Sequence, residues 1–426
     1  MDQTTYMIVA GLIFVIAYIA IITDKIDRTL VALAGACAMV VASVISQENA
    51  FLAVDWNTIL LLVSMMIMVM VIRRSGLFEY IAVKTIKIAK GDPIRILILI
   101  SIITGILSAF LDNVTCIIIM IPIILSLAKD LNINPIPFIL ADVFASNVGG
   151  TATLIGDPPN IMIGSKAGLN FNDFVQNETL ICAIILVVTT LLFAYIFRKK
   201  LKTTEECKAI VMQLNEKECI KDKKLVIKSI VVFVLVVVGF VLQSVFHYQT
   251  CTVAIVGAVV LLLISKIKPK KIVMEVEWNT ILFFCGLFVM VGGLQAAGII
   301  ELMAKSVVTL TNGNMNIAIL MILWMSAIAS AFIDNIPFTA TMIPLIKSFG
   351  TLAGASVGPL WWALSLGACL GGNGTIIGAS ANVVASGMSE DAGHKISFKY
   401  YFKYAFPVML VTIVISTVYL IIFYFK

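Results

Sequence analysis

The sequence predicts an all-α polytopic membrane protein of two inverted repeats, each with five transmembrane helices, one re-entrant hairpin and one broken helix. Three observations lead to this prediction. The 426 residues are 61% hydrophobic and only 13% charged, about half the charged fraction of soluble proteins, roughly 25%. Ten segments are apolar enough to serve as spanning helices, which need ~20 residues. Three motifs recur at one spacing of 222 residues.

The predicted spanning segments begin near the start of the chain, which has neither a basic n-region nor a cleavage signal. We therefore expect the first segment to be retained. The ten segments are 5–23, 29–46, 57–75, 138–168, 179–198, 227–246, 251–265, 279–297, 359–385 and 405–425.

Two further apolar stretches, 95–128 and 317–349, are each interrupted near the middle by Asp-Asn. Their arms are short. The arm from Val114 to Ala128 is about 22 Å long at 1.5 Å per residue, against a hydrocarbon core of ~30 Å. We therefore interpret both stretches as re-entrant hairpins that enter and leave on one side of the membrane.

The positions of Lys and Arg predict the topology. If neither hairpin crosses, 26 of the 30 basic residues lie in connections on one side, which the positive-inside rule assigns to the cytoplasm. We expect a protein of the cell (plasma or inner) membrane with both termini external and residues 199–226 as a cytoplasmic linker. This linker separates the first repeat, 1–198, from the second, 227–426.

The internal repeat rests on three pairs of motifs in register. DWNTILLLV at 55–63 matches EWNTILFFC at 277–285, and SAFLDN at 108–113 matches SAFIDN at 330–335. GGTATLIG at 149–156 matches GGNGTIIG at 371–378. Because each half has an odd number of crossings, the second copy should be inserted upside down. Inverted repeats with discontinuous helices are typical of secondary transporters, whose sites lie near the midplane.

The hairpin tips supply the first candidate site residues, Asp112 and Asp334. An ionised Asp in mid-membrane costs ~3 kcal/mol, so such residues usually face a cavity or a partner and mark an ion path. The alternative is that Asp-Asn only caps the second arm of each hairpin. The neighbouring Asn113 and Asn335 offer one acceptor and two donors each for a substrate or an ion.

The second candidate region is the helix 138–168, which must break near Asp157 because Pro158 and Pro159 follow. The freed backbone groups would line a cavity and become ligands, whereas close helix packing is the alternative for the glycines. The broken helix 359–385 has no proline, and Ala379 stands opposite Asp157. The predicted substrate- and ion-binding residues are Asp112, Asn113, Asn147, Gly149, Gly150, Thr151, Thr153, Gly156, Asp157, Asn160, Asp334, Asn335, Gly372, Asn373, Thr375 and Asn382.

Other classes of site find little support. Two histidines and eight cysteines without a CxxC pair predict neither a transition-metal site nor a disulfide framework. We expect no cofactor and no catalytic residue, but a coupling ion, H⁺ or Na⁺, with any Na⁺ near Asp112 and Asp334. The net charge of +6 reflects topology, so no nucleic acid is expected as a partner.

The GDPPN motif at 156–160, with the two SAF-x-DN tips, resembles the ion transporter superfamily with the citrate-transporter-like fold. The resemblance is to the branch of the P protein (pink-eyed dilution) and the arsenite/antimonite permeases, over essentially the whole chain. It implies a homodimer with a scaffold and a mobile transport domain that works by an elevator movement. Sodium-coupled carboxylate transporters of this superfamily carry Ser-Asn-Thr at each tip, where this chain has Asp112-Asn113-Val114 and Asp334-Asn335-Ile336.

Only Asn is kept at the tips, and a tip carboxylate would repel a carboxylate substrate. The first hypothesis is therefore H⁺- or Na⁺-coupled export of a small inorganic species such as arsenite, an ion or small anion. A Na⁺/H⁺ antiporter, a Na⁺-coupled di- or tricarboxylate symporter and a channel on the same scaffold are alternatives. An intramembrane aspartyl protease is disfavoured, because LIGD stands at 154–157 in place of its GxGD signature.

Overall fold

The structure is a computed structural model that describes residues 3–23 and 25–425, where every regular element is a helix. This confirms the all-α prediction, and nine of the described helices are long and apolar enough to cross a membrane. The first half contains α1 (Gln3–Thr23), α2 (Arg28–Val41), α3 (Gln47–Ala53), α4 (Trp56–Arg74), α5 (Leu77–Ile88), α6 (Pro93–Ser108), α7 (Asn113–Asp130), α8 (Ile136–Thr151), α9 (Pro158–Ala167), α10 (Phe171–Phe174), the π-helical turn η1 (Val175–Thr179) and α11 (Leu180–Phe197).

The second half follows a connection that holds two short helical elements. The connection contains α12 (Glu205–Met212) and the 3₁₀ turn η2 (Glu216–Cys219). After it come α13 (Lys223–Phe246), α14 (Thr250–Ser265), α15 (Pro269–Val273), α16 (Trp278–Ala296), α17 (Ile299–Thr311), α18 (Met315–Phe332), α19 (Asn335–Ala353), α20 (Gly358–Gly371), the 3₁₀ turn η3 (Gly372–Gly374), α21 (Ser380–Asp391) and α22 (Phe398–Tyr424).

The helix starts repeat at the spacing predicted from the motifs. Eight helices of the first half each have a counterpart that begins 222 residues later, so the local signals that start a helix are repeated along the chain. One pair is formed by the short helices α3 and α15, and the other seven pairs are longer. The longer pairs are α2 and α14, α4 and α16, α5 and α17, α6 and α18, α7 and α19, α8 and α20, and α9 and α21.

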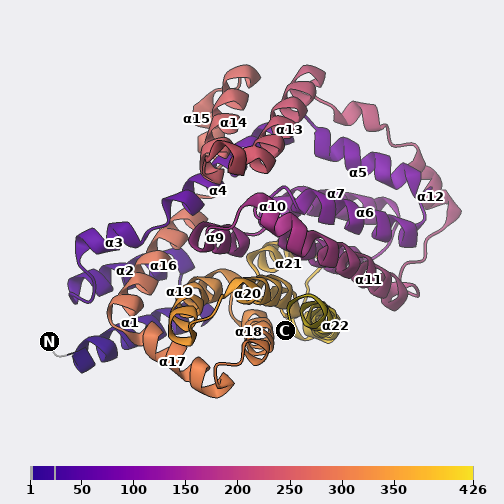
Figure 1. Ribbon diagram of the computed structural model, residues 1–426. Coiled ribbons are helices and arrows are strands. Elements are labelled where there is room, and N and C mark those ends of the chain that lie inside the picture. Colours follow the sequence, from indigo (N-terminus) through magenta and orange to yellow (C-terminus); the bar gives the residue numbers. More distant parts are fainter. Residues whose placement is uncertain (1–2, 24, 426) are drawn as a thin grey trace.

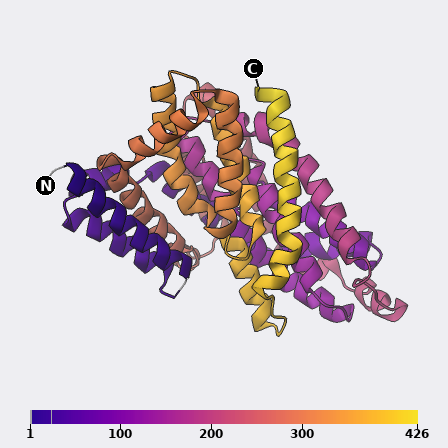
Figure 2. The ribbon, with the colours of Figure 1, turned by 90° about the horizontal axis from the view of Figure 1, so that it is seen from below.

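The two halves exchange helices at their contact. α2 packs against α16, and α14 packs against α4, so each of these pairs joins one half to the other. Figure 1 shows α1 and α2 beside α16, with α13 and α14 beside α4. In Figure 2, α1 and α2 lie side by side at one edge, and α22 ends at the marked C-terminus. The rest of the molecule is formed by the two hairpins, the two broken helices and the helices around them.

Each predicted hairpin corresponds to two helices joined at the Asp-Asn tip, α6 and α7 in the first half and α18 and α19 in the second, with longer arms than the sequence suggested. That the hairpins are re-entrant stays a prediction. α7 has 18 residues and α19 has 19, about 27 to 29 Å at 1.5 Å per residue. Arm length alone therefore does not distinguish a re-entrant hairpin from a spanning one, which corrects that argument. The tips are nevertheless buried inside the protein, since Asp112 is only 7% exposed and Asn335 only 2%. A buried tip is what a re-entrant hairpin requires.

Several predicted boundaries differ from the structure. The segment 29–46 is helical only to Val41, and α2 and α14, with 14 and 16 residues, are about 21 and 24 Å long. The linker 199–226 is partly helical and is held to α5 by an ion pair of 2.5 Å between Lys87 Nζ and Glu216 Oε2. The Lys87 ammonium lowers the pKa of the Glu216 carboxyl.

Two helices absent from the predicted spans, α5 and α17, are amphipathic. In α17 the buried residues Ile300, Ala304, Val307 and Thr311 follow a helical spacing, and Leu302 and Met303 are exposed. Residues at i, i+4, i+7 and i+11 share one face of a helix. Their shortness and mixed polarity explain why a search for long apolar segments missed both helices.

Candidate functional site

Four asparagine side chains meet at the centre of the candidate site. Asn147, on α8, accepts a hydrogen bond from Asn113 Nδ2 at 3.0 Å. Its own amide nitrogen donates to Asn373 Oδ1 at 3.0 Å and to Asn382 Oδ1 at 2.9 Å. All four side chains are buried. One amide therefore joins the first hairpin tip to the broken helix of the other half.

The two broken helices are held open by equivalent asparagines. Asn160 lies in the first turn of α9 and Asn382 in the first turn of α21. Each amide nitrogen donates two hydrogen bonds back to the segment that precedes its helix. The acceptors are the carbonyls of Thr151 (2.9 Å) and Thr153 (3.0 Å) for Asn160, and those of Gly372 and Thr375 (2.8 Å each) for Asn382. The break near Asp157, predicted from the two prolines, is thus present between α8 and α9.

Hydroxyl groups tie each hairpin to the broken helix of its own half. The hydroxyls at the ends of α6 and α18 donate to carbonyls of α8 and α20, and the linker threonines donate to the hairpin tips. These bonds are Ser108 Oγ to Ser146 O (2.7 Å), Ser330 Oγ to Ala368 O (2.6 Å), Thr153 Oγ1 to Ala109 O and Thr375 Oγ1 to Ala331 O. Together with the asparagine contacts, they make the hairpins and broken helices one hydrogen-bonded unit.

The two tip aspartates have different environments. Asp112 caps α7, where it accepts from Thr115 N at 3.0 Å and from Thr115 Oγ1 at 2.6 Å. Asp334 caps α19 through Ile336 N at 3.0 Å, and in addition its Oδ2 lies 3.2 Å from Arg28 Nη1. The capping interpretation therefore holds for both residues, while an ion-binding role stays a prediction. Among residues 3–23 and 25–425, an ion pair with a basic side chain is present at Asp334 and not at Asp112.

Arg28 connects this unit to α2. It lies at the first residue of α2, and its Nη1 also contacts Ser380 Oγ at 2.7 Å. The equivalent position, 250, is Thr250, which donates to Gln243 Oε1 at 2.9 Å. Within the described part of the chain, the second hairpin tip thus has a cationic partner and the first tip has none. From the sequence, Arg28 contributed only to the predicted topology, because a lone Arg beside an apolar segment usually marks the membrane face on which it lies.

Asp157 lies between the two tips. It is 1% exposed, and its carboxylate accepts from Asn335 Nδ2 at 3.3 and 3.5 Å. The Asp112 and Asp334 carboxylates both lie within electrostatic reach of it. Three acids therefore surround one buried region, and the second half supplies only Ala379 at the position equivalent to Asp157. The buried region is therefore rich in acidic groups, and most of them come from the first half.

Some predicted glycines serve close packing. A Cβ on Gly149 would lie 2.0 Å from Gly105 O on α6, so only glycine allows α6 and α8 to approach this closely. A Cβ on Gly156 would lie 2.5 Å from Ser108 O. The packing alternative is therefore the observed role of these two glycines, and cation binding by nearby carbonyls stays a prediction.

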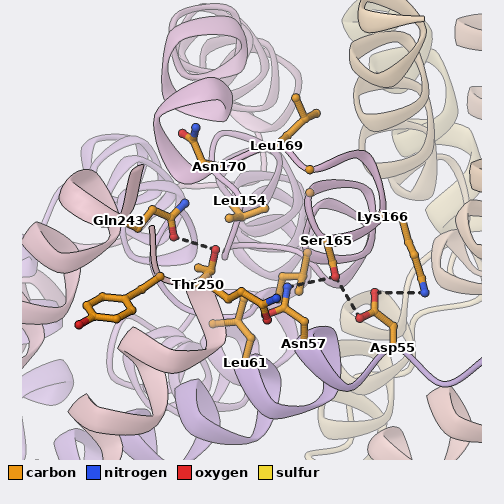
Figure 3. A pocket seen from close by; sticks show the side chains of 15 residues that line it. Asp55, Asn57, Leu61, Leu154, Ser165, Lys166, Leu169, Asn170, Gln243 and Thr250 are labelled. Carbon is orange, nitrogen blue, oxygen red and sulfur yellow. Dashed lines mark hydrogen bonds and ion pairs between the residues drawn. The ribbon is translucent and has the colours of Figure 1, made fainter. Parts of the chain in front are cut away.

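A cavity of about 420 Å³ lies to one side of this unit, between α4, α9 and α14 (Figure 3). Asp55 is its acidic group, accepting from Ser165 Oγ at 3.0 Å and lying 3.9 Å from Lys166 Nζ. Asn57 Nδ2 donates to Ser165 Oγ at 3.0 Å. By the 222-residue spacing, Asp55 is equivalent to Glu277, and Thr250 is equivalent to Arg28. The cavity is lined by Asp55 and Thr250. It therefore lies in the first half where Arg28 contacts Asp334 and Ser380 in the second half.

Glu277 is the acidic residue at the equivalent place, one residue ahead of the span α16. Burial and the nearby Asp112 carboxylate raise the pKa of Glu277 to about 7, although Thr280 and Arg28 act in the opposite direction. Glu277 thus lies outside the predicted membrane-spanning segments, and its pKa is near neutral pH and depends on the charge of Asp112 at the first hairpin tip. From the sequence alone, Glu277 was predicted only to be part of the repeated motif EWNTILFFC.

Two residues outside the predicted set of site residues complete the contacts of Asn160. Ser365 Oγ on α20 lies 2.6 Å from Asn160 Oδ1, and Cys369 Sγ lies 3.5 Å from the same atom. Cys369 is equivalent to Asn147, so the two halves make the same contact with different side chains. A Ser or Cys within an apolar run gives no signal in sequence. The equivalence with Asn147 through the 222-residue spacing could have identified Cys369.

Comparison with known proteins gives a consistent result. The family model described as "Citrate transporter" (CitMHS) matches residues 18–367. A Mycobacterium tuberculosis protein described as an uncharacterized transporter is 43% identical over 424 residues, covering 98% of this chain and 99% of that protein. The P protein of Mus musculus is 34% identical over 489 residues, covering 95% of this chain and 59% of that protein.

A solved structure shares the fold. The Alcanivorax borkumensis YdaH transporter, whose crystal structure is described as having an unusual topology, aligns with a TM-score of 0.58 at 12% identity. The alignment covers 88% of this chain and 86% of that one. The resemblance to the ion transporter superfamily, inferred from the GDPPN and SAF-x-DN motifs, is thereby confirmed.

Proposed function

Because the chain belongs to the citrate transporter (CitMHS) family of membrane transporters, we propose that it is a secondary active transporter coupled to H⁺ or Na⁺. We propose further that it exports a small inorganic species such as arsenite. One observation carries the proposal. The buried tips of both hairpins bear carboxylates, Asp112 and Asp334, and Asp157 lies between them. Buried acids in a membrane transporter are typical of ion paths and proton relays.

The residue types at the site support the proposal that the substrate is a small neutral or cationic species. The site contains the three acids Asp112, Asp157 and Asp334, and among the described residues Arg28 pairs only with Asp334, so a tricarboxylate would meet an excess of negative charge. The amides of Asn113, Asn147, Asn373 and Asn382 offer both donors and acceptors. An uncharged polyhydroxy species such as arsenous acid needs both kinds of group.

An elevator movement fits the contacts. The hairpins and broken helices are hydrogen-bonded to one another across both halves. The Arg28 contact with Asp334 and Ser380 links this unit to α2. We propose that the unit moves as one body against a scaffold that includes α2 and α16, within a homodimer as the resemblance implies, and that the Arg28 contact breaks when it moves.

Na⁺-coupled di- or tricarboxylate symport is the second candidate. It is favoured by the description of the matching family and by Arg28, whose guanidinium beside the second tip could bind a carboxylate. The absence of the tip hydroxyls of Ser-Asn-Thr disfavours it, because those donors would bind the substrate.

A flux screen in proteoliposomes tests these proposals. Purified protein is tested with arsenite, Na⁺, Li⁺, citrate and succinate under imposed pH and sodium gradients. We expect gradient-driven arsenite flux, and citrate or succinate flux in its place would support the second candidate. Flux of Na⁺ or Li⁺ against H⁺ alone would indicate a Na⁺/H⁺ antiporter.

The tip variants connect the flux to the site. Asp112→Asn and Asp334→Asn should abolish gradient-driven flux while the protein stays folded, since Asn still caps a helix. Asp92→Asn is the matched control, because Asp92 caps α6 through Arg95 N at 2.9 Å and lies outside the buried unit. Unchanged flux in both tip variants would contradict the proposed ion site.

A further inference from the structure

Glu178 is a buried carboxyl that the proposed site does not use. It lies in the π-helical turn η1 that joins α10 to α11, and its side chain is fully buried. Oε2 lies 2.8 Å from Ser365 Oγ, and Oε1 has no hydrogen-bond partner among the described residues. Single π-helical turns inside longer helices are frequent at functional sites. Glu178 directly precedes the predicted spanning segment 179–198 and was not among the predicted site residues.

The hydrogen bonds around Ser365 determine where the protons are. The Ser365 hydroxyl has one proton but two acceptors within reach, Asn160 Oδ1 at 2.6 Å and Glu178 Oε2 at 2.8 Å. An ionised Glu178 can only accept, so one of these two contacts would lack a proton. A protonated Glu178 donates to Ser365 Oγ, and Ser365 then donates to Asn160. Only the neutral carboxylic acid satisfies both contacts.

The surroundings of Glu178 also favour the neutral form. No ion pair to Glu178 is present within residues 3–23 and 25–425, and an unpaired buried carboxylate is unfavourable. The titratable groups that face it are uncharged when protonated, and none of them can act as a counter-cation. They are Cys182 on α11, Cys369 on α20, and Tyr419 and Tyr424 on α22.

We propose that Glu178 is a proton-binding site of this transporter, protonated in the present conformation and linked through Ser365 and Asn160 to the linker of the first broken helix. This inference rests on the proposed coupling to H⁺. On deprotonation the O–H bond of Glu178 breaks, the proton passes to water, and the carboxylate draws the Ser365 hydroxyl away from Asn160 Oδ1. The amide nitrogen of Asn160 holds the carbonyls of Thr151 and Thr153, so losing the Ser365 contact at the amide oxygen weakens the anchoring of the linker that carries Asp157.

The second half has no equivalent group. Position 400, which is 222 residues after Glu178, is Tyr400, and its hydroxyl contacts Lys200 Nζ at 3.1 Å near the surface. Asp157 likewise has Ala379 as its counterpart. The acid next to the linker and the acid on it therefore both belong to the first half, so deprotonation of Glu178 would act on the first broken helix alone.

Pyranine-loaded proteoliposomes test the proposal by measuring arsenite flux and internal pH together under an imposed pH gradient. Glu178→Gln keeps a neutral side chain, so we expect arsenite exchange without a gradient to persist and pH-driven accumulation to be lost. Glu178→Asp restores a carboxyl and should recover part of the coupling. Asp142→Asn is the matched control, because Asp142 is equally buried and accepts from the single hydroxyl of Thr104. The Asp142→Asn variant should still accumulate arsenite under the pH gradient.

Infrared difference spectra between acidic and alkaline pH add a readout that does not depend on flux. The carbonyl stretch of a protonated carboxylic acid should be present at neutral pH in the wild type and reduced in Glu178→Gln. If Glu178→Gln accumulates arsenite as the wild type does under a pH gradient, or if its carbonyl band is unchanged, the inference about Glu178 is overturned. The proposed proton coupling of the transporter would not be affected by either result. If the wild type shows no pH-driven flux of any probe, the proposed proton coupling fails, and the coupling role of Glu178 fails with it.

Discussion

The contact between Arg28 and Asp334 gives a quantitative prediction. Arg28 Nη1 and Asp334 Oδ2 are 3.2 Å apart, with side-chain exposures of 33% and 11%. At this distance two unit charges attract by about 5 kcal/mol at an effective dielectric constant of 20, and by about 1.3 kcal/mol in water. Because a third of the Arg28 side chain is exposed, we expect a net interaction near the lower value, about 1 to 2 kcal/mol.

A double-mutant cycle measures this interaction. Arg28→Gln, Asp334→Asn and the combined variant are compared with the wild type by reversible unfolding in mixed micelles, and the coupling free energy should be about 1 to 2 kcal/mol. The exposed pair Lys305 and Glu301, 2.9 Å apart and more than half exposed on both sides, is the control and should give less than about 0.5 kcal/mol. Equal coupling in the two pairs would refute the view that Arg28 holds the second hairpin tip.

Three further predictions concern the acids and the topology. Asp157→Ala should impair gradient-driven flux more than Ala379→Asp improves it, and equal, negligible effects would make the GDPPN motif merely structural. A cysteine introduced at position 247 should react with an impermeant reagent from outside, and a cysteine at position 210 should react from inside. Position 426 is also expected outside but lies beyond the described residues. The reverse labelling pattern would overturn the predicted topology. Since folding raises the pKa of Glu277 from 4.5 to about 7, the unfolding free energy of the wild type should fall relative to Glu277→Gln as pH rises through this range, and parallel pH profiles would contradict that assignment.

The fold was largely predictable because its signals are local. Apolar length, the Asp-Asn interruptions and the double proline each act over a few residues, and all three appear in the structure at the expected places. Arm length was the weak point of this reasoning. The helices of the hairpins extend past the apolar residues that defined the arms, since polar residues such as Lys129 and Asp130 continue α7.

The candidate site was predictable only in part, because some contacts join residues far apart in the sequence. Asn147 was expected near a broken helix, but its bond to Asn373 spans 226 residues. Arg28 and Glu178 flank apolar segments in the sequence, and the contacts of both depend on elements much later in the chain, namely Asp334 and Ser380 for Arg28, and Ser365 for Glu178. No local pattern distinguishes a flanking charge from one enclosed by a distant helix.

The exchange of helices between the halves has a consequence for biogenesis. α2 makes its main contact with α16, which emerges from the ribosome only after the first half and the linker have been made. During this interval α1 and α2 have only each other and the lipid, and contacts of such long sequence separation form late and slowly. Neither half should therefore assemble alone, whereas the two halves expressed as separate chains, divided in the linker, should find each other in the membrane.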